Sequence, residues 1–123
     1  GVEVVREAVE TAREKAARNH IQNGEFLWGD AAQAAETLRR RGERPHVVVL
    51  DPPRKGCGEA LAATVCGMAP QRVVYVSCDP ATLARDLRFF SARGYAPQEA
   101  APADLFPRTS HVETVVALSH KKI

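Results

Sequence analysis

One short stretch, residues 72–82, constrains the fold more than any other part of the sequence. Residues 72–77 are mostly β-branched or aromatic and predict a buried strand. The strand pattern ends in Ser-Cys-Asp-Pro at 77–80, and a helical pattern begins at once. This arrangement presents Cys78 at the carboxyl end of a strand, against the first turn of a helix. Ligands bind at that edge of open α/β sheets, and a helix start stabilises a thiolate.

Cys78 therefore has two interpretations. It is either a catalytic nucleophile or a small buried residue, because free cysteine is among the most buried residue types. The chain has three cysteines and no C-x-x-C spacing, which argues against a disulfide framework and against a zinc or iron–sulfur site. Such cysteine usage fits a reducing cytoplasm, so we expect a cytoplasmic protein.

Composition sets broad limits on what the chain does. Its 123 residues suffice for one small domain with one core. No apolar run approaches the length of a membrane span, and no signal-peptide pattern is present. The formal net charge of +2 permits a nucleic-acid partner without requiring one.

Strand and helix patterns alternate along the rest of the chain. Helices are predicted at 4–19, 31–41, 59–68 and 81–92, and strands at 1–3, 25–28, 46–50 and 111–119, with an extended segment at 94–106. The run at 46–50 is continuously apolar, as expected for a sheet covered on both faces. Alternation of this kind predicts an α/β, Rossmann-like, mostly parallel sheet. The last two strands have no helix between them and should form an antiparallel hairpin.

Three acidic residues follow predicted strands. Glu3 can accept hydrogen bonds from the ribose hydroxyls of a nucleoside, and Asp30 can accept one from an adenine amino group. Asp51 is followed by two prolines, which hold its carboxylate at the sheet edge with little backbone freedom. Simpler interpretations remain open for each residue: an acid at a helix start, a helix cap and a stiff turn.

Three blocks of the sequence resemble a known family. Residues 51–56 (DPPRKG), 77–86 (SCDPATLARD) and 104–113 (DLFPRTSHVE) look like signature blocks of the RNA (uracil-5-)-methyltransferases, in the family's order. Residues 1–3 and 29–30 fit the cofactor-binding half of that family. Within it, the bacterial 23S ribosomal-RNA enzymes look most similar, followed by the tRNA enzymes.

The resemblance implies a mechanism and a cofactor. Cys78 would add to carbon 6 of a uracil, which makes carbon 5 nucleophilic toward the methyl group of S-adenosylmethionine. Glu113 would then remove the proton from carbon 5. Glu3 and Asp30 would hold the ribose and the adenine of the cofactor, and Asp51 would face the junction between cofactor and target base. The target uracil must be flipped out or lie in a loop of the RNA.

Other polar residues of these blocks have weaker assignments. Arg54 and Lys55 follow the rigid prolines and would pair with RNA phosphates, with a solvated loop as the alternative. His111 would orient Glu113 or contact RNA, with a structural role as the alternative. Arg85 and Asp86 are expected to form a structural ion pair on the helix after Cys78.

The glycine-rich loop that precedes these blocks in the family does not occur in this sequence. We therefore expect residues 1–123 to be the C-terminal portion of a methyltransferase catalytic domain. The absent first strand would sit between the strand ending at Glu3 and the strand ending at Asp51. Its absence would expose strand edges and favour self-association, and this piece alone would bind cofactor weakly.

Two rival functions remain at this stage. Amino-methyltransferases of adenine or cytosine use a D-P-P loop followed by an aromatic residue, whereas Arg54 follows here. Alternatively, the chain is a non-catalytic RNA-binding piece.

Overall fold

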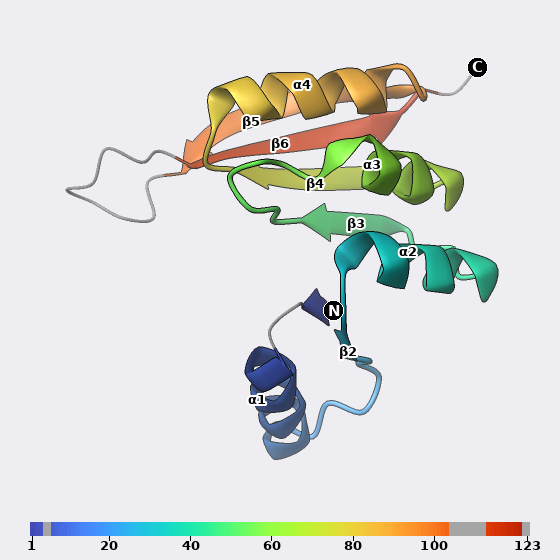
Figure 1. The fold of residues 1–123 in the computed structure, drawn as a ribbon, viewed down its shortest axis with the longest axis vertical. Coiled ribbons are helices and arrows are strands. Elements are labelled where there is room, and N and C mark those ends of the chain that lie inside the picture. The colour runs from blue at the N-terminus through green and yellow to red at the C-terminus, as the bar shows by residue number, and fades with distance from the viewer. Residues whose placement is uncertain (4–5, 104–112, 122–123) are drawn as a thin grey trace.

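A computed structural model describes residues 1–3, 6–103 and 113–121. Strands and helices alternate along them, which confirms the α/β fold (Figure 1). In chain order the elements are β1 (Val2–Glu3), α1 (Arg6–Arg18), β2 (Leu27–Trp28), α2 (Ala31–Arg40), β3 (Val47–Leu50), α3 (Gly58–Gly67), β4 (Arg72–Ser77), α4 (Pro80–Ser91), β5 (Tyr95–Ala103) and β6 (Glu113–His120). These bounds follow the predicted ones closely.

The larger sheet has four strands in the order β3-β4-β6-β5. β3 is parallel to β4, whereas β6 runs antiparallel to both β4 and β5. The predicted hairpin of the last two strands is therefore confirmed. Within β5 the register shifts between Pro97 and Glu99. β5 lies at the edge of the sheet, where proline is tolerated because one side of the strand needs no hydrogen bonds.

The smaller sheet consists of β1 and β2, which pair in parallel. It lies with α1 at one end of the molecule, below β3 in the view of Figure 1. Among the described residues, β1 and β3 are not hydrogen-bonded to each other. The sheet is thus divided where the sequence predicted it, between the strand ending at Glu3 and the strand ending before Asp51. Association with another chain through these open edges is not tested and stays a prediction.

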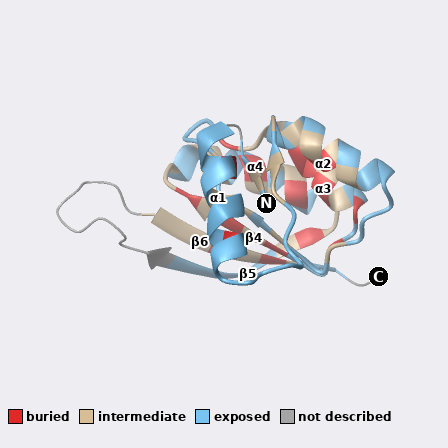
Figure 2. Ribbon diagram, turned by 90° about the horizontal axis from the view of Figure 1, so that it is seen from below, coloured by how far each residue is buried: buried red, intermediate tan, exposed pale blue. Residues whose placement is uncertain are grey.

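The hydrophobic core lies between one face of the larger sheet and the helices α2, α3 and α4 (Figures 1 and 2). Its members are Ala35, Leu61, Ala62, Val65, Met68, Val73, Tyr75, Phe90, Tyr95, Val116 and Leu118. Tyr95 also donates a hydrogen bond from its hydroxyl to the Pro70 carbonyl, 2.5 Å away, so its polar atom is satisfied inside the core. Within the described part of the chain, no helix is long and apolar enough to cross a membrane.

The opposite face of the larger sheet is not covered by the described residues, and here the expectation from 46–50 was wrong. Val47 and Val49 are 52% and 65% exposed. Val48 and Leu50, the alternate residues, pack against the core. A continuous apolar run does not by itself say which faces are covered, because a strand sends successive side chains to opposite faces.

We predict that the two faces of this sheet contribute very differently to stability. Val73→Ala removes two methyl groups from a fully buried position and should lower the free energy of unfolding by about 2–3 kcal/mol. Val49→Ala, the matched change on the open face, should cost less than about 0.5 kcal/mol. Urea unfolding followed by circular dichroism measures both values. Equal losses would contradict this arrangement of the core.

Candidate active site

Cys78 lies at the turn between β4 and α4 and is half-buried. The turn is fixed by its neighbours: the Ser77 hydroxyl donates to the Asp79 carbonyl at 2.9 Å and accepts from the Asp79 amide at 3.1 Å. The Asp79 carboxylate caps α4 by accepting from the amides of Ala81 and Thr82, at 3.0 and 3.1 Å. These bonds, the one from Thr82 first, hold the pKa of Asp79 below its usual value. The first amides of α4 therefore donate hydrogen bonds to the Asp79 carboxylate, whereas the sequence suggested that the start of this helix would stabilise a Cys78 thiolate.

Glu113 is brought to Cys78 by the antiparallel pairing of β4 with β6. The register pairs Ser77 with Thr114. One step further along, Cys78 and Glu113 are the next opposed positions, and opposed residues of antiparallel strands have Cβ atoms about 5 Å apart. Glu113 is half-buried. The register thus brings the chain segments that carry the candidate nucleophile and the candidate base to the same edge of the sheet, although they belong to different elements.

Asp51 reaches the same edge through the other neighbour of β4. The parallel register pairs Leu50 with Tyr75, so Asp51 follows β3 at the level of Val76. Asp51 is exposed. Because Leu50 and Tyr75 face the core, the pleat continued by one residue takes Asp51 to the open face of the sheet.

The other two candidate carboxylates belong to the region of the smaller sheet: Glu3 ends β1, and Asp30 follows β2. Glu3 pairs with Trp28, and the amide of Gly29 donates to the Glu3 carbonyl at 2.9 Å. Asp30 caps α2, with its Oδ2 accepting from the amide of Gln33 at 3.2 Å. The predicted cap is confirmed, and only one of the two Asp30 carboxylate oxygens accepts this hydrogen bond. Glu3 and Asp30 therefore lie at or just beyond the carboxyl ends of neighbouring parallel strands.

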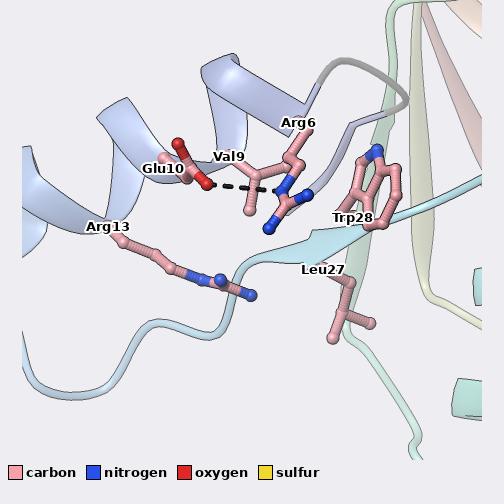
Figure 3. Close-up of a pocket in the computed structure, with 6 residues that line it drawn as sticks. All are labelled: Arg6, Val9, Glu10, Arg13, Leu27 and Trp28. Atoms are coloured by element: carbon pink, nitrogen blue, oxygen red, sulfur yellow. Dashed lines mark ion pairs between the residues drawn. The ribbon is translucent and has the colours of Figure 1, made fainter.

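A hollow of about 430 Å³ lies between α1 and β2 (Figure 3). The Arg6 guanidinium lies over the ring of Trp28, 5.5 Å from its centre, and pairs with Glu10 at 3.4 Å. Trp28 is 59% exposed, which is unusual for the largest side chain. Trp28 was not among the predicted site residues, although a tryptophan directly before Gly29 and Asp30 was a visible signal.

The loop after β3 carries the remaining candidates. Arg54 and Lys55 are both exposed, which fits contact with RNA and also a solvated loop. His111 lies outside the described residues. The predicted Arg85–Asp86 ion pair is confirmed, with 3.1 Å between Arg85 Nη2 and Asp86 Oδ1.

Asp86 has two further partners that the sequence did not reveal. Its Oδ2 accepts from the Tyr75 hydroxyl at 2.5 Å and from the amide of Cys57 at 2.8 Å. Burial raises the pKa of this carboxyl, but the bonds from Tyr75, Cys57 and Arg85 outweigh burial, so the pKa lies below its usual value. Residues on three separate elements meet here, and no local sequence pattern predicts such a meeting.

The other two cysteines differ from Cys78 in their surroundings. Burial, together with the negative charge of Asp86, raises the pKa of the Cys57 thiol to about 12. Burial raises the pKa of Cys66 to about 11. All three cysteines are free thiols in the described structure. Because the thiolate is the reactive form, the raised pKa values of Cys57 and Cys66 disfavour a nucleophilic role for either near neutral pH.

Comparison with known families gives one match across the chain. A family model described as tRNA (Uracil-5-)-methyltransferase matches residues 1–121. A Bacillus cereus protein described as an RNA methyltransferase is 51% identical over 119 residues, or 97% of this chain and 26% of that protein. A Geobacter sulfurreducens protein described in the same way is 49% identical over 121 residues, or 98% of this chain and 24% of that protein. The chain thus spans about a quarter of the length of these relatives.

Solved structures agree with this match. The tRNA (uracil-54, C5)-methyltransferase of Pyrococcus abyssi, in complex with S-adenosyl-L-homocysteine, superposes with a TM-score of 0.76 at 31% identity, covering 96% of this chain and 27% of that one. An rRNA methylase from Streptococcus thermophilus superposes with a TM-score of 0.71 at 10% identity, covering 98% of this chain and 72% of that one. At such low identity the second similarity shows the fold alone.

We predict that alkylation separates the three cysteines. At about pH 8 iodoacetamide should label Cys78 and leave Cys57 and Cys66 almost unmodified, because pH 8 lies well below the raised pKa of each buried thiol. Peptide mass spectrometry measures the labelling, and the protein unfolded in urea, in which all three should react, is the control. Labelling of Cys57 or Cys66 as fast as Cys78 would contradict the prediction.

Proposed function

The chain belongs to the tRNA (uracil-5-)-methyltransferase family, and we propose that the whole protein methylates carbon 5 of a uridine in RNA. The observation that supports this proposal is the register of β4 with β6, which pairs Ser77 with Thr114, the chain neighbours of Cys78 and Glu113. We further infer that residues 1–123 form part of the catalytic domain. Membership of this family argues against the rival methylation of adenine or cytosine amino groups.

The candidate residues fit S-adenosylmethionine as the methyl donor. Glu3 and Asp30 present carboxylates at the ends of adjacent parallel strands, and carboxylates accept hydrogen bonds from ribose hydroxyls and from an adenine amino group. Asp51 directly follows β3, whose last residue Leu50 pairs with Tyr75 of the strand that precedes Cys78. When bound, the cofactor supplies the methyl group that carbon 5 receives. The Pyrococcus abyssi relative was solved with S-adenosyl-L-homocysteine, which supports the same cofactor here.

Cys78 and Glu113 divide the chemistry of the uracil ring. The Cys78 thiolate forms a bond to carbon 6, and the electron pair of the 5,6 double bond moves to the O4 enolate, which makes carbon 5 nucleophilic. After carbon 5 has received the methyl group, it carries one proton too many. Glu113 removes that proton, the double bond re-forms, and the bond from carbon 6 to sulfur breaks. The protonated Glu113 then returns its proton to solvent.

RNA is the proposed substrate, held in part by the exposed loop cations Arg54 and Lys55. His111 remains a candidate for the same role or for orienting Glu113. The resemblance of the signature blocks favours 23S ribosomal RNA, and the similarity to a Pyrococcus tRNA enzyme favours tRNA as the alternative. Methylation of both RNAs by the whole protein, compared side by side, decides between them. The reaction is proposed to take place in the cytoplasm, where thiolate chemistry is protected from oxidation.

We predict that the whole protein forms a covalent adduct with RNA containing 5-fluorouridine when cofactor is present. Fluorine does not leave as a proton does, so the reaction stops while carbon 6 is still bonded to sulfur. Cys78→Ala should form no adduct on a denaturing gel. Cys66→Ala, the control on α3, should keep it because its thiol takes no part. The assignment fails if the unmodified protein gives no adduct, or if the adduct survives Cys78→Ala.

Glu113→Gln should trap the adduct on ordinary uridine. The amide does not accept the carbon 5 proton, so elimination of Cys78 stops, and the yield of 5-methyluridine should fall by about 10²-fold or more. Glu99→Gln on the neighbouring strand β5 is the matched control and should turn over normally. Nucleoside analysis together with a denaturing gel measures both effects. Normal turnover by Glu113→Gln would exclude Glu113 as the base.

A further inference from the structure

A single buried carboxylate joins the three elements around the candidate site. Asp86 belongs to α4 and is 0% exposed. It accepts from the Tyr75 hydroxyl of β4 at 2.5 Å and from the Cys57 amide, at the end of the loop that follows β3, at 2.8 Å. Arg85 completes the set with an ion pair at 3.1 Å. A buried charge is tolerated only when it is well partnered, and Asp86 has a partner for each oxygen.

The same cluster holds the backbone of the loop 51–57. Arg85 Nη2 donates to the Lys55 carbonyl at 2.5 Å, so the loop is bound to α4 at Lys55 as well as at Cys57. Gly56 between them is buried and has a φ of 85°, a conformation that favours glycine. A Cβ added to Gly56 would collide with the carboxylate of Asp86. The loop therefore lies directly against Asp86, closer than any other residue type would allow.

Asp86 is also tied to both sides of Cys78. Tyr75 belongs to the strand that ends just before Cys78, and Asp86 belongs to the helix that Asp79 caps just after it. The loop that Asp86 holds begins at Asp51, which follows β3. One carboxylate thus connects the strand before the nucleophile, the helix after it and the loop that carries Asp51, Arg54 and Lys55.

We propose that Asp86, acting with Arg85, is a positioning residue that fixes the 51–57 loop relative to Cys78. It does not touch the reacting atoms in this role, and the proposal rests on the proposed uracil methylation. Its consequence is kinetic: a loop released from α4 still folds and still binds, but Asp51 no longer meets the reaction in the right place. A misplacement of about 1 Å can lower a rate by about 10²-fold.

The test uses the whole protein and compares Arg85→Ala with Arg88→Ala. The Arg85 side chain is 49% exposed, so its removal should leave the melting temperature within about 3 °C of the original. Arg88 is an exposed cation on the same helix and is the matched control. Asp86→Asn keeps the shape of the side chain and removes its charge, and it is included although it is the variant more prone to misfold. Steady-state methylation of RNA containing ordinary uridine gives kcat and KM, and hydrogen exchange of the 51–58 peptide reports whether the loop is held.

We expect Arg85→Ala to lower kcat about tenfold or more, with KM for cofactor changed less than about threefold. The 51–58 peptide should exchange faster than in the unmodified protein, and Arg88→Ala should alter neither quantity. An unchanged kcat overturns the positioning role. The role is also overturned if Arg85→Ala raises only the KM for RNA and Arg85→Lys returns that KM to its original value, because this result identifies a phosphate contact.

Failure of the two proposals is distinguishable. If the unmodified protein forms no adduct, the proposed methylation falls, and the positioning role in it falls as well. The exchange experiment does not depend on that activity. If loop exchange is unchanged in both Arg85→Ala and Asp86→Asn, the inference fails even when the unmodified protein methylates uridine.

Discussion

The antiparallel ladder between β4 and β6 is the interaction on which the candidate site depends. It pairs Ser77 with Thr114, the chain neighbours of Cys78 and Glu113, across a long stretch of sequence. A slip of one residue would carry Glu113 to the opposite face of the sheet. The register is held far from the site, because Val116 and Leu118 are 2% and 0% exposed and must face the helices. Burial of two aliphatic side chains in the core therefore sets the geometry of an acid at the sheet edge.

The loop after β3 lacks such a ladder beyond Leu50. The two prolines restrict its first part, but a fixed φ does not fix where the following residues lie. That task falls to hydrogen bonds from α4, above all those of Asp86, whose burial is costly unless every oxygen is satisfied. A polar anchor is more demanding than an apolar contact, since it allows only one arrangement of donors. This requirement for one arrangement of donors accounts for the close approach of Gly56 to the Asp86 carboxylate, and for the presence of a buried charge beside an otherwise apolar core.

Much of the fold could be predicted because local patterns carry it. The order of strands and helices, the final hairpin and the Asp30 cap follow from periodicity and from capping chemistry. The proximity of Cys78 and Glu113 came from resemblance to a family, since no local pattern relates residues on separate strands. Patterns also failed at 46–50, where an apolar run predicted two covered faces and Val49 is exposed. Coverage is a property of what packs on a strand, and the strand's own residues do not encode it.

Ser77 and Cys78, at the end of β4, are adjacent in the chain but differ in what their side chains do. Ser77 is 5% exposed and turns toward the helices, where its hydroxyl is used entirely in shaping the turn. Cys78, the next residue, lies beyond the end of β4 and is half-buried, and strand alternation would direct its side chain away from the helices. A nucleophile on the packed face would be unreachable for a base the size of uracil. A single step along the chain thus separates a residue that stabilises the turn from the residue that is proposed as the nucleophile.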